Sequence, residues 1–212
     1  MLKSVFAVIV CLVVLSPPAD QCRAEVNLGI SIDEEGVKGF YLAIGEHFEV
    51  EARRVTAVKK AEIPDEEMPV VFFLAKRCYV SPSIIIRHRQ AGLSWMDICL
   101  KYGLTAEIFW VDLKQTPGPP YGKAWGHFKK KKKNKWGSIR FTDIEIVNFV
   151  NLKFVSEHYG HSPDEVVKMR GKGTSFVKIH GNVKKAKSKK KDHAGPPPPK
   201  KAGKLKGKPK KR

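Results

Sequence analysis

The chain has 212 residues, and its 40 lysines and arginines exceed its 21 aspartates and glutamates by a formal net charge of +19. The whole excess lies in two tracts: residues 129–135 contain six lysines and no acid, and residues 184–212 contain 14 basic residues and one acid. This distribution excludes a uniformly basic fold and indicates an electrically balanced body that carries two cationic segments.

The first residues are typical of a secretory signal peptide. Lys3 precedes an uninterrupted apolar run, Val5–Leu15, which is well short of the roughly 20 residues that span a bilayer. Cys22 and Ala24 place small residues before a cleavage site that follows Ala24. We therefore expect residues 1–24 to be removed, leaving a periplasmic or secreted protein without a transmembrane span. A buried strand or an uncleaved anchor is the alternative.

Removal of the signal peptide would also remove Cys11 and Cys22 and leave Cys78 and Cys99. Disulfides form in exported proteins, and a bridge between these two would close a loop of about 20 residues and contribute roughly 3 kcal/mol. Cysteine is also a common buried apolar residue. The sequence therefore leaves a disulfide and two free thiols as equal alternatives.

Residues 25–62 form an N-terminal segment with mixed signals. Apolar residues at 26, 28, 30 and 32 alternate with polar or small ones, which predicts a short β-strand. A turn is expected at Asp33–Gly36. Phe40–Phe48 could form a second strand or a short helix, and we expect a helix because its Glu46-His47-Phe48 sequence recurs as Glu157-His158-Tyr159.

An internal repeat organises the middle of the chain. Residues 81–98 align with residues 162–179 at a constant shift of 81 and without a gap. The matched pairs include Arg89 and Arg170, Gly92 and Gly173, and Trp95 and Phe176. This similarity predicts a duplicated unit, with one copy over 63–111 and the other over 139–183.

Each copy is predicted to contain three short helices, so the expected fold class is mostly α. Apolar stretches at Met68–Lys76 and Ile144–Val155 predict the first helix of each copy. Ser81-Pro82 and Ser162-Pro163 would begin the second helices, with each serine hydroxyl as the cap. Glycines at 92 and 173 would end these helices, and serines at 94 and 175 would cap the third ones. Trp95 and Ile98 share one helical face and are expected to pack in the core.

The first copy resembles the helix-turn-helix patterns of bacterial DNA-binding proteins. The resemblance rests on Arg89-x-x-Gly92-x-Ser94-Trp95-x-Asp97-Ile98 followed by Tyr102-Gly103-Leu104. It implies a helical pair whose second helix enters the major groove. The segment that would serve as recognition helix, Thr105–Val111, carries one charged residue, Glu107. We therefore retain the tri-helical shape and not the DNA-binding function.

Residues 112–138 are rich in proline and glycine, which predicts a long loop rather than a helix. Aromatic residues bracket the lysines of this loop: Tyr121, Trp125, Phe128 and Trp136. Such aromatics can stack on bases or sugars while lysines contact phosphates. Because exposed aromatic surface is costly, we expect the first three to pack onto the helices while the lysines stay exposed.

Residues 184–212 consist mainly of lysine, alanine, glycine and proline, which predicts a disordered basic tail. Cationic tails bind polyanions by releasing condensed counterions, and a tail that serves only solubility is the alternative. The candidate polyanion-binding residues of both tracts are Lys129, Lys130, Lys131, Lys132, Lys133, Lys135, Lys184, Lys185, Lys187, Lys189, Lys190, Lys191, Lys200 and Lys201.

Enzyme signatures are missing from the sequence, so no catalytic residue and no cofactor are predicted. There is no glycine-rich phosphate loop, no Gly-x-Ser-x-Gly elbow and no His-Glu-x-x-His motif. His158 and His161, with His180, are the strongest candidates for metal ligands. Gly160 between them is expected to end a helix, so packing at a helix end is preferred over a metal site. The acidic residues Asp65–Glu67 suit the first turn of a helix.

The sequence as a whole predicts an exported, non-enzymatic binding or scaffold protein. Its expected partners are polyanions: lipopolysaccharide, another anionic envelope polymer, or nucleic acid. One alternative is a periplasmic metal-binding protein or enzyme centred on His158 and His161. A second is a structural envelope protein that binds a protein partner through its helical repeats.

Overall fold

The structure is a computed structural model, and it describes residues 34–192. This range is mostly helical and contains no strand. The predicted signal peptide, the predicted strand over 26–32 and residues 193–212 lie outside it. The α-helices are α1 (Glu34–Phe48), α2 (Ala52–Lys60), α3 (Met68–Cys78), α4 (Pro82–Gln90), α5 (Trp95–Lys101), α6 (Gly122–Lys130), α7 (Asp143–Tyr159), α8 (Pro163–Gly171) and α9 (Phe176–Asp192). Short 3-10 helices are η1 (Asp65–Glu67), η2 (Ala106–Phe109) and η3 (Lys133–Ser138).

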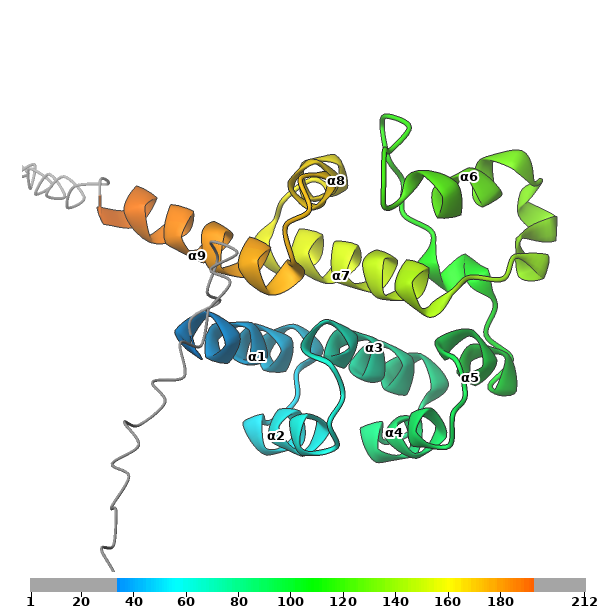
Figure 1. Cartoon of the computed structure of the whole chain (residues 1–212), viewed down its shortest axis with the longest axis horizontal. Helices are drawn as coiled ribbons and strands as arrows, with labels where there is room; N and C mark the ends of the chain where they lie inside the picture. The colour runs from blue at the N-terminus through cyan, green and yellow to red at the C-terminus, as the bar shows by residue number, and fades with distance from the viewer. Residues whose placement is uncertain (1–33, 193–212) are drawn as a thin grey trace, which may run out of the picture. The chain divides into compact units, whose positions relative to one another are not determined.

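Helices α3 and α7 pack against each other and form the centre of the core (Figure 1). Helix α1 packs on α9 and also contacts α3 and α7, while α4 lies on α3 and α8 on α7. Large apolar side chains fill the space between these helices; the fully buried ones include Phe40, Ile44, Met68, Leu74, Ile85, Trp95, Phe149, Phe154 and Phe176. The central helices are therefore buried along most of their length, as their apolar sequences predict.

Element boundaries recur at the spacing found in the sequence. Helices α4 and α8 begin at Pro82 and Pro163, and α5 and α9 begin at Trp95 and Phe176. Helices α3 and α7 both end at a residue in the left-handed conformation, Tyr79 with φ 55° and Gly160 with φ 71°. The predicted first helices and the helix over Phe40–Phe48 are confirmed.

Serine caps form at three of the four predicted positions. Ser94 and Ser162 each accept a hydrogen bond from the third residue of their helix, and Ser175 accepts one from the Lys178 amide. Ser81 makes no such bond to the backbone, and its hydroxyl contacts that of Ser83 at 2.8 Å. The predicted cap at Ser81 is therefore wrong.

The N-terminal segment contains more helix than the sequence suggested. Helix α1 begins at Glu34, inside the expected turn, because Phe40, Ile44 and Phe48 recur at helical spacing and all become buried. Helix α2 was not predicted. Its inner face carries Val55 and Val58, which are buried.

The region 112–138 is not the long loop that its prolines and glycines suggested, because it contains α6 and η3. The cis peptide between Pro119 and Pro120 precedes α6. Ala124, Trp125 and Phe128 then bury one helical face, and this packing outweighs the low helix propensity of Gly122 and Gly126. The segment Thr105–Val111, which the helix-turn-helix resemblance would make a recognition helix, contains only the short η2.

The predicted disorder from residue 184 onward is wrong for residues 184–192, which continue α9. Residues Phe176–Val183 anchor this helix, since Phe176, Ile179 and Val183 are buried. Adding residues to an existing helix avoids the cost of nucleation, and lysine and alanine are good helix formers. Within residues 34–192, no single helix is long and apolar enough to cross a bilayer; the bent pair Asp65–Cys78 and Pro82–Gln90 meets that test by length and composition.

Candidate polyanion interface

The lysines of the first cationic tract lie on one segment, residues 129–135, which we call the lysine loop. It begins in the last turn of α6 and ends in η3. All six of its lysines are exposed, as the sequence predicted. In the described part of the chain, none of them forms an ion pair. Their positive charge is therefore available to an external anion.

Four aromatic side chains, Trp110, Trp125, Phe128 and Trp136, form a cluster beneath the lysine loop, which we call the aromatic platform. The Trp110 ring lies 4.9 Å from Trp136, 5.2 Å from Phe128 and 6.0 Å from Trp125, measured between centroids. Trp125 and Phe128 are buried, together with Tyr121, which confirms that these three aromatics pack onto the helices. The platform thus joins the lysine loop to the core.

Hydrogen bonds fix the backbone of the lysine loop. The indole N–H of Trp136 donates to the carbonyls of Phe128 at 3.0 Å and Lys131 at 3.1 Å. The Trp125 indole donates to the Val111 carbonyl at 3.2 Å. The Lys131 ammonium donates to the Ser138 hydroxyl at 2.9 Å, which closes the loop on itself.

Two lysines lie over rings of the platform. The Lys129 ammonium is 4.8 Å from the Trp125 centroid and 5.8 Å from the Trp110 centroid, and Lys133 lies 6.0 Å from Trp136. A cation over an aromatic face is attracted without being neutralised. These contacts therefore position ammonium groups and leave their charge unpaired.

Residues 184–192, the described part of the second cationic tract, lie on a different element from the lysine loop. Lys184 and Lys185 are exposed on α9, and Lys187, Lys189, Lys190 and Lys191 belong to the same helix. Lys200 and Lys201 lie outside the described residues. Figure 1 shows α9 and α6 at opposite ends of α7. The lysine loop and α9 therefore carry two separate cationic sites rather than one patch.

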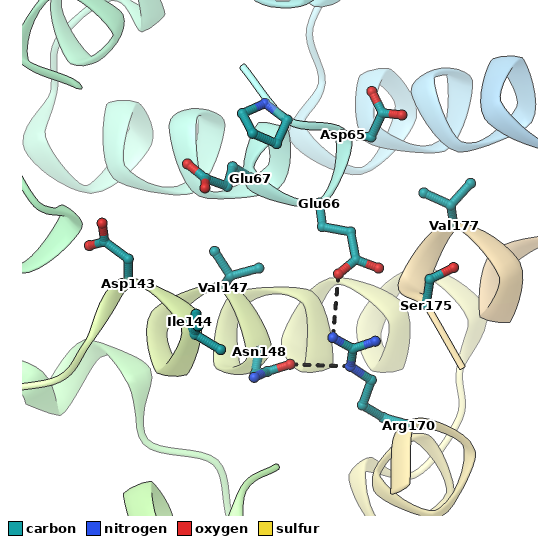
Figure 2. A pocket seen from close by; sticks show the side chains of 11 residues that line it. Asp65, Glu66, Glu67, Asp143, Ile144, Val147, Asn148, Arg170, Ser175 and Val177 are labelled. Carbon is teal, nitrogen blue, oxygen red and sulfur yellow. Dashed lines mark hydrogen bonds and ion pairs between the residues drawn. The ribbon is translucent and has the colours of Figure 1, made fainter. Parts of the chain in front are cut away.

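Two arginines of the body, Arg170 and Arg89, are paired with carboxylates, unlike the lysines of the loop. Arg170 donates to Glu66 at 3.4 Å, to the Asn148 side chain at 3.2 Å and to the Thr174 carbonyl at 2.9 Å. Glu66 also accepts from the Phe176 amide at 2.5 Å and so caps α9. Figure 2 shows Glu66 extending from η1 toward Arg170, at a cavity of about 480 Å³.

Arg89 repeats this arrangement in the other half. It donates to Glu67 at 3.2 Å, to Asp143 at 2.6 Å and to the Leu93 carbonyl at 3.2 Å. Asp143 also accepts from the Trp95 amide at 2.7 Å. Both guanidinium groups lie over the aromatic ring that begins the next helix, at 4.6 and 4.7 Å. The hydrogen bonds of Arg170 and Glu66 beside the cavity of Figure 2 thus join η1 to α7, α8 and α9.

Replacing Glu66 with glutamine is expected to lower the free energy of unfolding by about 2 kcal/mol. Glutamine offers one acceptor oxygen, so its amide group would face either the Arg170 guanidinium or the Phe176 amide. Urea denaturation of Glu66→Gln beside Glu49→Gln, an exposed position, measures the effect. Equal stability of the two variants would contradict this role of Glu66.

The three candidate histidines, His158, His161 and His180, contact different partners. His158 lies 3.7 Å from Glu46, and His47 lies 3.6 Å from Glu157, so the repeated Glu-His sequences pair reciprocally between α1 and α7. His161 instead lies 3.6 Å from Glu165. Between residues 34 and 192, no group of three or more His, Cys, Asp or Glu side chains is placed to hold a metal ion.

His180 is 2% exposed and hydrogen-bonds through Nδ1 with the Tyr159 hydroxyl. Burial lowers the pKa of His180 to about 4, and Lys184 and His158 contribute in the same direction. The unfolded chain, with an ordinary histidine pKa of about 6.5, therefore binds more protons than the folded protein between those two values. The contribution of His180 to stability is therefore fully present above about pH 6.5 and is lost as the pH falls from about 6.5 toward 4.

We expect acidification from about pH 6.5 to 4 to cost at most about 3 kcal/mol through His180. Urea unfolding at several pH values should show a weaker pH dependence for His180→Gln than for the wild type. His161→Gln, at a half-exposed site, is the control and should keep the wild-type dependence. An unchanged dependence in His180→Gln would contradict the assignment.

Cys78 and Cys99 are both free thiols in the structure. Burial raises the pKa of Cys99 to about 12 and also raises the pKa of Cys78. Since the thiolate is the reactive form, we expect native alkylation followed by peptide mapping to modify Cys78, which is half-buried, well before Cys99. Recovery of a Cys78–Cys99 disulfide-linked peptide would contradict this prediction.

Comparison with models of known protein families, with curated proteins and with solved structures finds no match to this chain. The site is therefore defined by its own geometry. Trp110 lies in the segment Thr105–Val111, and its place at the centre of the aromatic platform was not predicted. The sequence brackets the lysines with Trp125, Phe128 and Trp136 but gives no local signal for Trp110, which lies well before them in the chain.

Proposed function

We propose that this protein binds phosphate-bearing polyanions through the lysine loop. The observation that carries the proposal is a set of six exposed, unpaired lysines on a segment that the aromatic platform holds in place. Ammonium groups of this kind displace the counterions condensed on a polyanion, which favours association. A segment that is ordered before binding loses less conformational entropy on binding.

In this proposal the protein recognises the negative charge of the polymer rather than the identity of its bases. Trp125 and Phe128 are buried, so only the half-buried Trp110 and Trp136 offer partial ring surface for stacking. Phosphate contacts position a ligand but carry no sequence information. We therefore favour polymers recognised by their phosphates, such as lipopolysaccharide, another anionic envelope polymer or a nucleic-acid backbone.

The proposal also assigns roles to the C-terminal tract and to the signal peptide. Residues 184–212 act as a second cationic segment, and the signal peptide delivers a non-enzymatic binding protein to the periplasm or the exterior. We also propose that the two halves arose by duplication. The recurrence of helix boundaries and of the arginine contacts at Arg89 and Arg170 supports this origin.

A salt titration tests the proposal. The chain ending at Asp192, which keeps α9 and the lysine loop, is titrated with labelled single-stranded DNA and, separately, with inorganic polyphosphate. If about four lysines contact phosphates at once, the logarithm of affinity should fall with the logarithm of salt at a slope of about −3. A slope near zero, or loss of binding when residues 193–212 are removed, would contradict the proposal.

A further inference from the structure

A second cavity, separate from the lysine loop, lies between α1, α3, α7 and η2. Its volume is about 730 Å³, within the range of roughly 300–1,000 Å³ that small-molecule sites occupy. Its apolar lining includes Phe48, Phe73, Val150 and Phe154, all of which are buried. We call this cavity the cationic pocket, because of the side chains at its edge.

Three cations and one carboxylate line the cationic pocket: Lys76, Arg77, Lys153 and Glu157. Glu157 is paired with His47 at 3.6 Å, whereas none of the three cations forms an ion pair in the part of the chain that the structure describes. Lys153 is half-buried, and burial lowers its pKa. An anion in the pocket would stabilise this partly desolvated ammonium group.

Tyr79, which also lines the pocket, gives an independent indication of a ligand. Its side chain is 96% exposed, and its backbone is left-handed with φ 55°. That conformation is unfavourable for a bulky residue, and the equivalent end of α7 has Gly160 instead. This backbone conformation ends α3, as Glu49 with φ 56° ends α1, and it leaves an exposed aromatic side chain beside the cavity, where a ligand can contact it.

We propose that the cationic pocket binds a small amphiphilic anion, an acyl carboxylate whose hydrocarbon chain lies on the phenylalanines and whose carboxylate meets Lys76, Arg77 and Lys153, with Tyr79 covering the mouth. The apolar lining is complementary to the chain and the unpaired cations are complementary to the carboxylate. A phosphate polymer lacks the apolar part and is suited to the lysine loop instead. The two sites are therefore independent, and one can fail without the other.

Isothermal titration calorimetry of the full chain with decanoate, below its micelle concentration, tests the proposal. Decyltrimethylammonium, with the same chain length and a positive head group, is the matched ligand control. Saturable binding of decanoate at least about tenfold tighter than that of the cation is the expected result. Equal affinities for the two ligands, or no saturable binding of decanoate, would overturn the proposal.

Two variants locate the site. Lys153→Met removes a charge that burial disfavours, so the protein should fold, and it should weaken decanoate binding about tenfold or more. Lys101→Met, at an exposed position on α5, should leave the affinity unchanged. Tyr79→Gly should raise the melting temperature by relieving the left-handed backbone and still weaken decanoate binding. Wild-type affinity in both Lys153→Met and Tyr79→Gly would place decanoate elsewhere and overturn the assignment.

Discussion

Replacing all six lysines of the lysine loop with glutamine is expected to lower the affinity for a phosphate polymer roughly four-thousandfold at about 50 mM salt. Affinity for a single strand changes as the salt concentration to the power of about −0.7 for each phosphate contact, so each contact contributes about eightfold at that salt. About four simultaneous contacts give the stated loss. Fluorescence anisotropy with labelled single-stranded DNA measures it.

A matched variant separates the lysine loop from net charge. It replaces six exposed lysines elsewhere with glutamine: Lys38, Lys60, Lys101, Lys114, Lys168 and Lys172. Both variants lose the same charge, but screening beyond about 14 Å at that salt leaves distant lysines with little influence on a polymer bound at the loop. The control should therefore lose only a small part of the affinity. Equal losses in the two variants would show that net charge alone binds the polymer.

Replacing Phe128 with alanine is expected to lower the free energy of unfolding by about 4 kcal/mol. Phe128 is 1% exposed, and its ring lies 4.9 Å from Trp136 and 5.4 Å from Phe141. Removing the ring leaves a cavity between the aromatic platform and the core, which should also loosen the lysine loop. Urea denaturation followed by tryptophan fluorescence measures both effects.

Ile144→Ala serves as the control for this prediction. Ile144 is 72% exposed, so truncation there removes little buried surface and should change stability by less than about 0.5 kcal/mol. A comparably small effect of Phe128→Ala would contradict the role of the ring in joining the lysine loop to the core.

Local signals allowed most helices of the two proposed repeat units to be predicted. The apolar run at Met68–Lys76, the Ser-Pro pair at 162 and the capping serine at 94 act within a few residues of the helix ends that they define. Such features are visible in a sequence because both partners lie in one short window. The helix over Phe40–Phe48 was predicted instead from the recurrence of its Glu46-His47-Phe48 sequence as Glu157-His158-Tyr159.

Helix α6 could not be predicted from local propensity. Gly122 and Gly126 weaken a helix in isolation, and only the burial of Trp125 and Phe128 against distant residues compensates. Trp110, which completes the platform, comes from another segment of the chain. The position of the six lysines was evident in the sequence, but the structure that holds them was not.

Long-range pairing of charges was also invisible in the sequence. Asp65–Glu67 was expected to serve the helix that follows it, whereas Glu66 caps α9, which begins 110 residues later. Arg89 likewise pairs with Asp143 on α7. Such contacts depend on how the two halves pack, and no local pattern specifies that packing. The cationic pocket was missed for the same reason, since its residues come from four elements.

Lysine footprinting tests the central claim most directly. The full chain is acetylated briefly with and without inorganic polyphosphate, and the extent of modification at each lysine is measured by mass spectrometry. The account predicts that the polymer protects Lys129–Lys133 and Lys135, while Lys60 and Lys101, exposed on α2 and α5, react at the same rate in both samples. Unchanged reactivity across the lysine loop, with protection confined to residues 184–212, would contradict it.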